Sequence, residues 1–237
     1  MKNLVTLLSL TLFIVSCNKN KEVSSEELET IIYKVESFHS ITNNSFVDIE
    51  ISESVPKDEI HFIASKKNIE NITREVNNGN LIIDSSRKNF NFGNDTNITA
   101  KINSNSLSSF TINGAGNIKS HITQIATNIK TDISGAGNLE LLISNESVTN
   151  DISGVGNVDL IGKTKTLKTE ISGAGNLNAT KLSAVESWNS ISGVGNASVN
   201  VSDKLHAEIS GVGNVEYKGN PKEIIKEISG LGSVNEQ

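Results

Sequence analysis

Short apolar stretches alternate with polar residues along most of the chain. Residues 46–51 and 60–63 alternate with a period of two, and NNGN at 77–80 is a strong turn signal before the next apolar run. This period places apolar side chains on one face of a β-strand. The pattern therefore predicts an all-β protein. Residues 33–110 are expected to form its less regular part, which starts the same sheet stack.

From residue 111 a phrase of the form I-S-G-x-G-N recurs in steps of 18 to 21 residues. A fixed period of this kind is typical of stacked repeat architectures. The step is too short for a propeller blade of about 40 residues, and the phrase lacks the Leu spacing of a leucine-rich repeat. We therefore expect residues 111–234 to form a parallel β-helix, with one coil per repeat. The repeat Ile residues are Ile112, Ile133, Ile152, Ile171, Ile191, Ile209 and Ile228.

In such a stack, each residue lies on its equivalent in the next coil. The Ile column is expected to form an apolar spine, and the Asn column a ladder of side-chain amides. The glycines are expected at a corner, where φ is positive or the backbones approach too closely for a Cβ atom. Ala115, Ala136, Val155, Ala174, Val194 and Val212, which lie between the glycines, are expected to point inward. The structural repeat residues are Gly114, Gly116, Asn117, Gly135, Gly137, Asn138, Gly154, Gly156, Asn157, Gly173, Gly175, Asn176, Gly193, Gly195, Asn196, Gly211, Gly213 and Asn214.

An acidic column precedes the repeat Ile in five coils, with Ser190 in a sixth. If the Ile points inward, this column points outward and stacks like charges about 5 Å apart. It is either a solvated face partly neutralised by lysines or a weak site for cations or a partner. Trp188, the only Trp, is either a lid on the coil or a binding anchor. The possible surface-binding residues are Asp132, Asp151, Glu170, Glu208, Glu227 and Trp188.

Several kinds of chemistry fit this sequence poorly. The repeated phrase lacks the third Gly and the following helix of a dinucleotide site, and it has Asn where a calcium roll has carboxylates. The net charge of −6 argues against a nucleic-acid partner. The four histidines have no metal-ligand spacing, and no nucleophile elbow is present. We therefore expect no cofactor, no metal and no catalytic residues, and we leave the oligomeric state open.

The N-terminus carries a targeting signal. Residues 1–16 have a basic Lys2 and an apolar stretch too short to span a membrane, and Ile14-Val15-Ser16-Cys17 resembles the lipobox of a bacterial lipoprotein. We expect cleavage before Cys17, lipidation of its thiol, and a polar tether over residues 17–32. The alternative is a free thiol at the end of a secretory leader. Residues 33–237 then form the folded domain, which has no further Cys.

The seven phrases behind a lipobox resemble the family called putative auto-transporter adhesin, head GIN domain. The resemblance covers residues 36–234 and includes Phe38-His39-Ser40-Ile41 and Asp48-Ile49-Glu50-Ile51. It implies a right-handed, single-stranded parallel β-helix and surface exposure. We expect a non-enzymatic protein anchored to the cell envelope, in the outer membrane of a Gram-negative bacterium, that binds an extracellular glycan or protein. The alternatives are a structural or sensory component that self-assembles, and a carbohydrate-active enzyme.

Substitution of Cys17 tests the lipid anchor. In Cys17→Ser the acyl chains, which contribute about 0.8 kcal/mol per buried methylene, cannot be attached. Fractionation of cells is expected to move the variant from the membrane to the soluble fraction. Continued membrane association through the N-terminus would contradict the lipobox interpretation.

Overall fold

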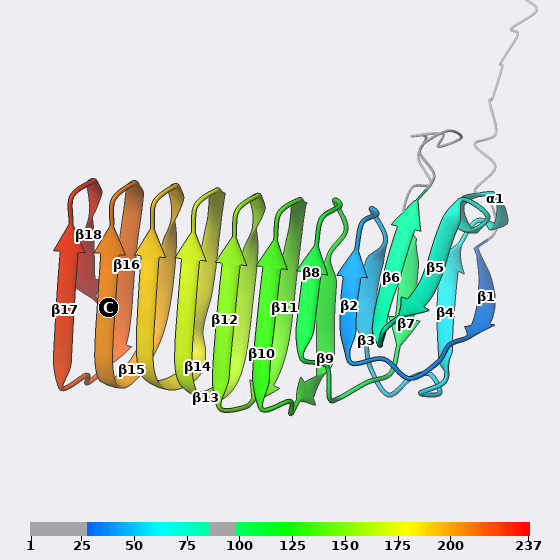
Figure 1. The fold of residues 1–237 in the computed structure, drawn as a ribbon, viewed down its shortest axis with the longest axis horizontal. Helices are drawn as coiled ribbons and strands as arrows, with labels where there is room; N and C mark the ends of the chain where they lie inside the picture. Colours follow the sequence, from blue (N-terminus) through cyan, green and yellow to red (C-terminus); the bar gives the residue numbers. More distant parts are fainter. Residues whose placement is uncertain (1–27, 86–97) are drawn as a thin grey trace, which may run out of the picture.

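The computed structural model describes residues 28–85 and 98–237 and shows one continuous sheet wound into a solenoid (Figure 1). Residues 1–27, with the expected signal peptide, Cys17 and most of the tether, lie outside the described residues. No helix within the described part is long and apolar enough to cross a bilayer. The elements are β1 (Glu29–Lys34), β2 (Ser40–Asn43), β3 (Asp48–Ile51), β4 (Glu59–Ala64), α1 (Lys66–Ile69), β5 (Ile72–Asn77), β6 (Asn80–Ser85), β7 (Thr99–Ile102), β8 (Ser109–Ile112), β9 (Ile118–Gln124), β10 (Asn128–Ile133), β11 (Ala136–Ser144), β12 (Ser147–Ile152), β13 (Val155–Ile171), β14 (Ala174–Ile191), β15 (Val194–Ile209), β16 (Val212–Gly219), β17 (Glu223–Ile228) and β18 (Leu231–Glu236).

Each repeat forms one coil with two strand segments. The first segment ends at the repeat Ile, as β10 does at Ile133, and the second begins just after the corner, as β11 does at Ala136. Pairing between coils is parallel and joins equivalent residues, so that Ile133 lies opposite Ile152, and Ile152 opposite Ile171. The expected solenoid of about seven coils is confirmed.

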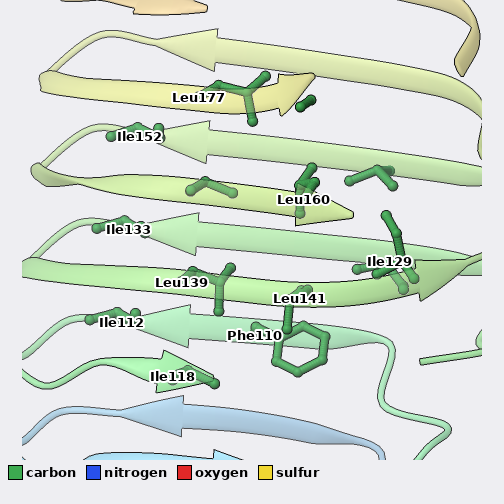
Figure 2. Packing of buried hydrophobic residues seen from close by; sticks show 14 of the residues in the cluster. Phe110, Ile112, Ile118, Ile129, Ile133, Leu139, Leu141, Ile152, Leu160 and Leu177 are labelled. Carbon is green, nitrogen blue, oxygen red and sulfur yellow. The ribbon is translucent and has the colours of Figure 1, made fainter. Parts of the chain in front are cut away.

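Several apolar columns on the inner faces of the strands form the core (Figure 2). The repeat Ile residues from Ile112 to Ile209 are fully buried, and so is the column that runs from Ile118 and Leu139 to Val215. The expected apolar spine is therefore confirmed for these repeat Ile residues, whereas Ile228 in the last coil is 45% exposed because no further coil covers it. One further inward column is largely polar, with Thr131 Oγ1 donating to Asn150 Oδ1 at 2.5 Å.

The less regular N-terminal part continues the same stack, as expected. Strands β2 and β3 pair in parallel with β8 and β9, and β6 and β7 pair in parallel with β2 and β3. Beyond them β4 and β5 run antiparallel and β1 pairs with β4, so the direction of the chain changes at this end of the stack. Residues 29–32, which were expected in the tether, belong to β1 instead. Strand β1 packs its alternating side chains Ile31 and Tyr33 against the core.

Charged side chains close the other end. In the last coil Lys226 lies in register with buried Ala207, and Glu236 lies in register with buried Tyr217. The ammonium group of Lys226 donates to the Val234 carbonyl oxygen at 2.8 Å and lies 5.7 Å from the centre of the Tyr217 ring. Inward-pointing charges on an exposed edge oppose the addition of further strands. The terminal coil therefore ends the stack.

Close approach between coils explains the two glycines of the phrase. A Cβ atom on Gly135 would overlap the carbonyl oxygen of Gly114. A Cβ atom on Gly137 would overlap the carbonyl oxygen of Gly116 and lie 3.0 Å from Cγ2 of Ile112. Neither glycine has a left-handed backbone, so of the two expected reasons the structure supports contact with the preceding coil.

Gly175→Ala tests this contact. The new Cβ atom would overlap the carbonyl oxygen of Gly156 and lie 2.8 Å from Cγ2 of Ile152. We expect the free energy of unfolding to fall by about 1–3 kcal/mol, as for other overpacked sites, in chemical denaturation followed by circular dichroism. Ala174→Val is the matched control, because Val occupies the same column at Val155 and Val194. Equal stability of the two variants would contradict the explanation.

Candidate functional site

The residues between the two glycines point outward, not inward. Val155 is 60% exposed, Val194 59% and Leu231 75%, and the Ala residues of the column are exposed as well. The expectation that they plug the corner is therefore wrong. The reason is the alternation of side chains along the following strand. Leu139 points inward, so Gly137, two residues earlier, also faces inward, and Ala136 faces outward.

This outward column and the Asn ladder line a shallow groove along the corner. The groove has a volume of about 850 Å³ and crosses seven coils, from Ala115 to Leu231. We call it the corner groove. Every side chain that lines it is uncharged. The lining residues are Ala115, Asn117, Ala136, Gly137, Asn138, Val155, Gly156, Asn157, Ala174, Gly175, Asn176, Val194, Gly195, Asn196, Val212, Gly213, Asn214 and Leu231.

The Asn column forms the ladder that its stacking predicted. The amide nitrogen Nδ2 of each Asn donates to the Oδ1 atom of the Asn in the preceding coil, at 2.9 Å for Asn157 to Asn138 and 3.2 Å for Asn214 to Asn196. In several coils the backbone N–H donates to the same oxygen, as at Asn138 and Asn196. These bonds hold one edge of the corner groove in fixed register.

The ladder has a distinct first and last member. Nδ2 of Asn117 donates to the Asp48 carboxylate at 2.8 Å, and at the other end Ser233 Oγ donates to Asn214 Oδ1 at 2.8 Å. Sequence reasoning missed Asp48 because the first coil has no glycine phrase. The signal was the Asp48-Ile49 pair, which matches Asn117-Ile118 and pairs with it through β3 and β9.

The acidic column lies on a different surface of the solenoid. Asp132, Asp151 and Glu170 are in register on the outer face of the first strand segments, with Glu208 and Glu227 further along, as expected. Ser190 interrupts the column and its hydroxyl lies 3.5 Å from a Glu208 oxygen. The structure therefore separates these residues from the corner groove.

Neutralisation of the acidic column is incomplete. Lys130 Nζ is 3.9 Å from Asp132, and His206 Nε2 is 3.8 Å from Glu227. Partial burial, with repulsion from Asp132 and Glu170, raises the pKa of Asp151, and nearby Lys130 opposes the shift. Within the described residues no group of three His, Cys, Asp or Glu side chains is arranged to hold a metal ion.

Trp188 is half-buried on the same face as the acidic column. It lies two residues before Ser190 on β14, in register with Lys168 on one side and His206 on the other. Trp188 thus lies close along the strand to Ser190, which interrupts the acidic column. It does not line the corner groove, and whether it binds a ligand stays a prediction.

The fold is a β-solenoid with an uncharged groove along one side. The sequence profile described as "Putative auto-transporter adhesin, head GIN domain" matches residues 37–221. The chain belongs to this family, as its repeats predicted, and the family name indicates a protein of the cell surface or envelope.

Solved structures with the same fold come from the bacterial genera Bacteroides and Parabacteroides. A putative adhesin from Bacteroides fragilis is 23% identical with a TM-score of 0.83, and a putative lipid binding protein from Parabacteroides distasonis is 23% identical with a TM-score of 0.70. A putative adhesin from Parabacteroides distasonis is 20% identical with a TM-score of 0.65. Each alignment covers 90% of this chain and 98% of the other. A search of curated proteins finds no match. At these identities the likeness establishes the fold alone.

The raised pKa of Asp151 predicts how the stability of the protein depends on pH. Because the pKa of Asp151 is raised in the folded protein, its ionised form disfavours folding, and stability falls as pH rises from the unfolded value of 3.8 through the folded value. Asp151→Asn is expected to stabilise the protein at pH 7 by less than about 1 kcal/mol, with no gain below the unfolded pKa.

Lys130→Met is expected to change the stability in the opposite direction. It removes the positive charge that lowers the pKa of Asp151 and should destabilise the protein at pH 7. Thermal unfolding at several pH values measures both variants. A loss of stability in Asp151→Asn at pH 7 would contradict the assignment of repulsion to this column.

Proposed function

We propose that this protein is a non-enzymatic, lipid-anchored protein of the cell envelope that binds an extended ligand in the corner groove. The observation that carries the proposal is the column of exposed apolar side chains beside a rigid amide ladder over seven coils. Exposed apolar patches of this kind often mark binding surfaces on soluble domains. Membership in an adhesin family supports a binding role.

The composition of the groove favours binding over catalysis. Its side chains come from Ala, Asn, Gly, Val and Leu, none of which is a general acid, a general base or an activated nucleophile. The carboxylates of the acidic column stand on another face, repeated at regular intervals. Glycoside hydrolysis instead needs one pair of carboxylates that converge on a single bond.

The lipid anchor rests on the N-terminal sequence, where Cys17 follows an apolar leader. A tether of about ten residues before β1 would hold the solenoid close to the membrane surface.

Both ends of the stack argue against the alternative role in self-assembly. Antiparallel strands β1, β4 and β5 close the N-terminal end. Lys226 and Glu236 occupy core positions at the C-terminal end, where a further coil would have to bury them.

Aspartate substitutions in the groove test the proposed function. The full-length protein would be assayed for capture on a panel of immobilised polysaccharides and extracellular matrix proteins. Val155→Asp with Val194→Asp places two charges in the apolar column, and we expect at least about a tenfold loss of capture, since burying an unpaired charge is costly.

Val185→Asp is the matched control. Val185 is 43% exposed on β14 but does not line the groove, so this variant should bind like the unmodified protein. Thermal unfolding monitors the fold of all variants. Unchanged capture by the folded groove variant would refute the assignment of the groove as the binding surface.

A further inference from the structure

We infer that the corner groove is a site for a neutral, extended glycan, with sugar rings on the apolar column and hydroxyl groups on the Asn ladder. The inference rests on the proposed function, because it names the class of ligand for the same groove. Three features of the groove support a neutral glycan: its lack of charge, its hydrogen-bonding groups and its repeat distance.

The groove is neutral along its whole length. No Lys or Arg lines it to hold an anionic polymer, and no Asp or Glu lines it to hold a cationic one. The chain as a whole carries a net charge of −6, which repels polyanions at long range. A ligand matched to this surface is uncharged.

The Asn ladder leaves one edge of the groove with spare hydrogen-bond donors. An amide nitrogen has two N–H groups. Nδ2 of Asn157 donates to Asn138, and Nδ2 of Asn176 donates to Asn157, both at 2.9 Å. No other bond from these two nitrogens to the described residues is present. The side chains are exposed, so one N–H group of each is open to a ligand.

These donors discriminate between apolar and hydroxylated ligands. A hydrocarbon chain in the groove would displace water from the amides and offer no acceptor, at a cost of about 1–3 kcal/mol for each unsatisfied group. Sugar hydroxyl groups would accept those hydrogen bonds, while the C–H faces of the rings pack on Val155 and Val194. A glycan therefore satisfies both edges of the groove.

The repeat distance favours a glycan over a peptide. The coils follow one another at about 4.8 Å, so the apolar and amide columns repeat at that interval. An extended peptide presents equivalent groups every two residues, at roughly 6.7 Å, so its side chains would lose register with the columns of the groove. The spacing of the coils is closer to the length that one pyranose unit adds to an extended chain. Six steps, from Asn117 to Ser233, give the groove a length of roughly 29 Å.

The experiment measures how affinity depends on ligand length. Calorimetry with the full-length protein would use neutral, linear oligosaccharides from the disaccharide to the heptasaccharide. We expect affinity to rise with each added sugar until the groove is filled. A series without length dependence, or without binding, would overturn the inference.

Two Asn→Ser substitutions test the ladder directly. Asn157→Ser with Asn176→Ser removes the spare donors but keeps a hydroxyl in the column, and such a hydroxyl can donate to the preceding coil, as Ser233 does to Asn214. We expect the affinity for the hexasaccharide to fall about tenfold. Asn178→Ser is the control, since Asn178 bonds to Asp159 outside the groove. Equal affinities of the double variant and the control would overturn the role of the ladder.

Failure of the inference can be told apart from failure of the proposed function. Binding of a uronic acid polymer or of phosphatidylcholine vesicles in place of neutral oligosaccharides, lost in Val155→Asp with Val194→Asp, would overturn the ligand class and keep the groove as the binding surface. Binding of neutral oligosaccharides that is indifferent to both groove variants would place the site elsewhere and overturn both proposals.

Discussion

In-register contact between equivalent residues of neighbouring coils is the constraint on which the rest of this structure depends. It requires that the backbone at the corner pass close to the backbone of the preceding coil, and Gly135 and Gly137 permit this because a Cβ atom would overlap carbonyl oxygens there. Once the corner is fixed, pairing places Ile on Ile and Asn on Asn. Each residue of the phrase therefore recurs at the same place in successive coils.

The repetition of equivalent residues along the stack has opposite effects on the two outer surfaces. At the corner it joins amides into a ladder in which each Asn both donates and accepts, so repetition stabilises the groove. On the face with the acidic column it brings Asp132, Asp151 and Glu170 together, and their repulsion contributes to the raised pKa of Asp151. One surface is neutral and internally bonded, whereas the other retains charge that solvent and a few lysines offset only partly.

The sequence predicted the solenoid well because a period of about 19 residues and an alternation of two leave few architectures open. It predicted the Ile spine, the Asn ladder and the outward acidic column for the same reason. It failed for Ala136 and its equivalents, because an apolar residue between two glycines resembles a buried one unless the alternation is counted back from Leu139. It also missed Asp48, since this residue lies 69 positions before Asn117 and the first coil has no glycine phrase that would align the two.

The two ends of the ladder are chemically different from its middle. Asp48 can only accept at the start, and Ser233 donates at the finish, while every Asn between them does both. A coil could therefore be gained or lost between these two residues without disturbing either terminus. If the groove binds a linear polymer as proposed, the number of repeats sets the length of polymer that fits. Gain or loss of a single phrase would then lengthen or shorten that polymer by one unit, with the chemistry of the groove unchanged.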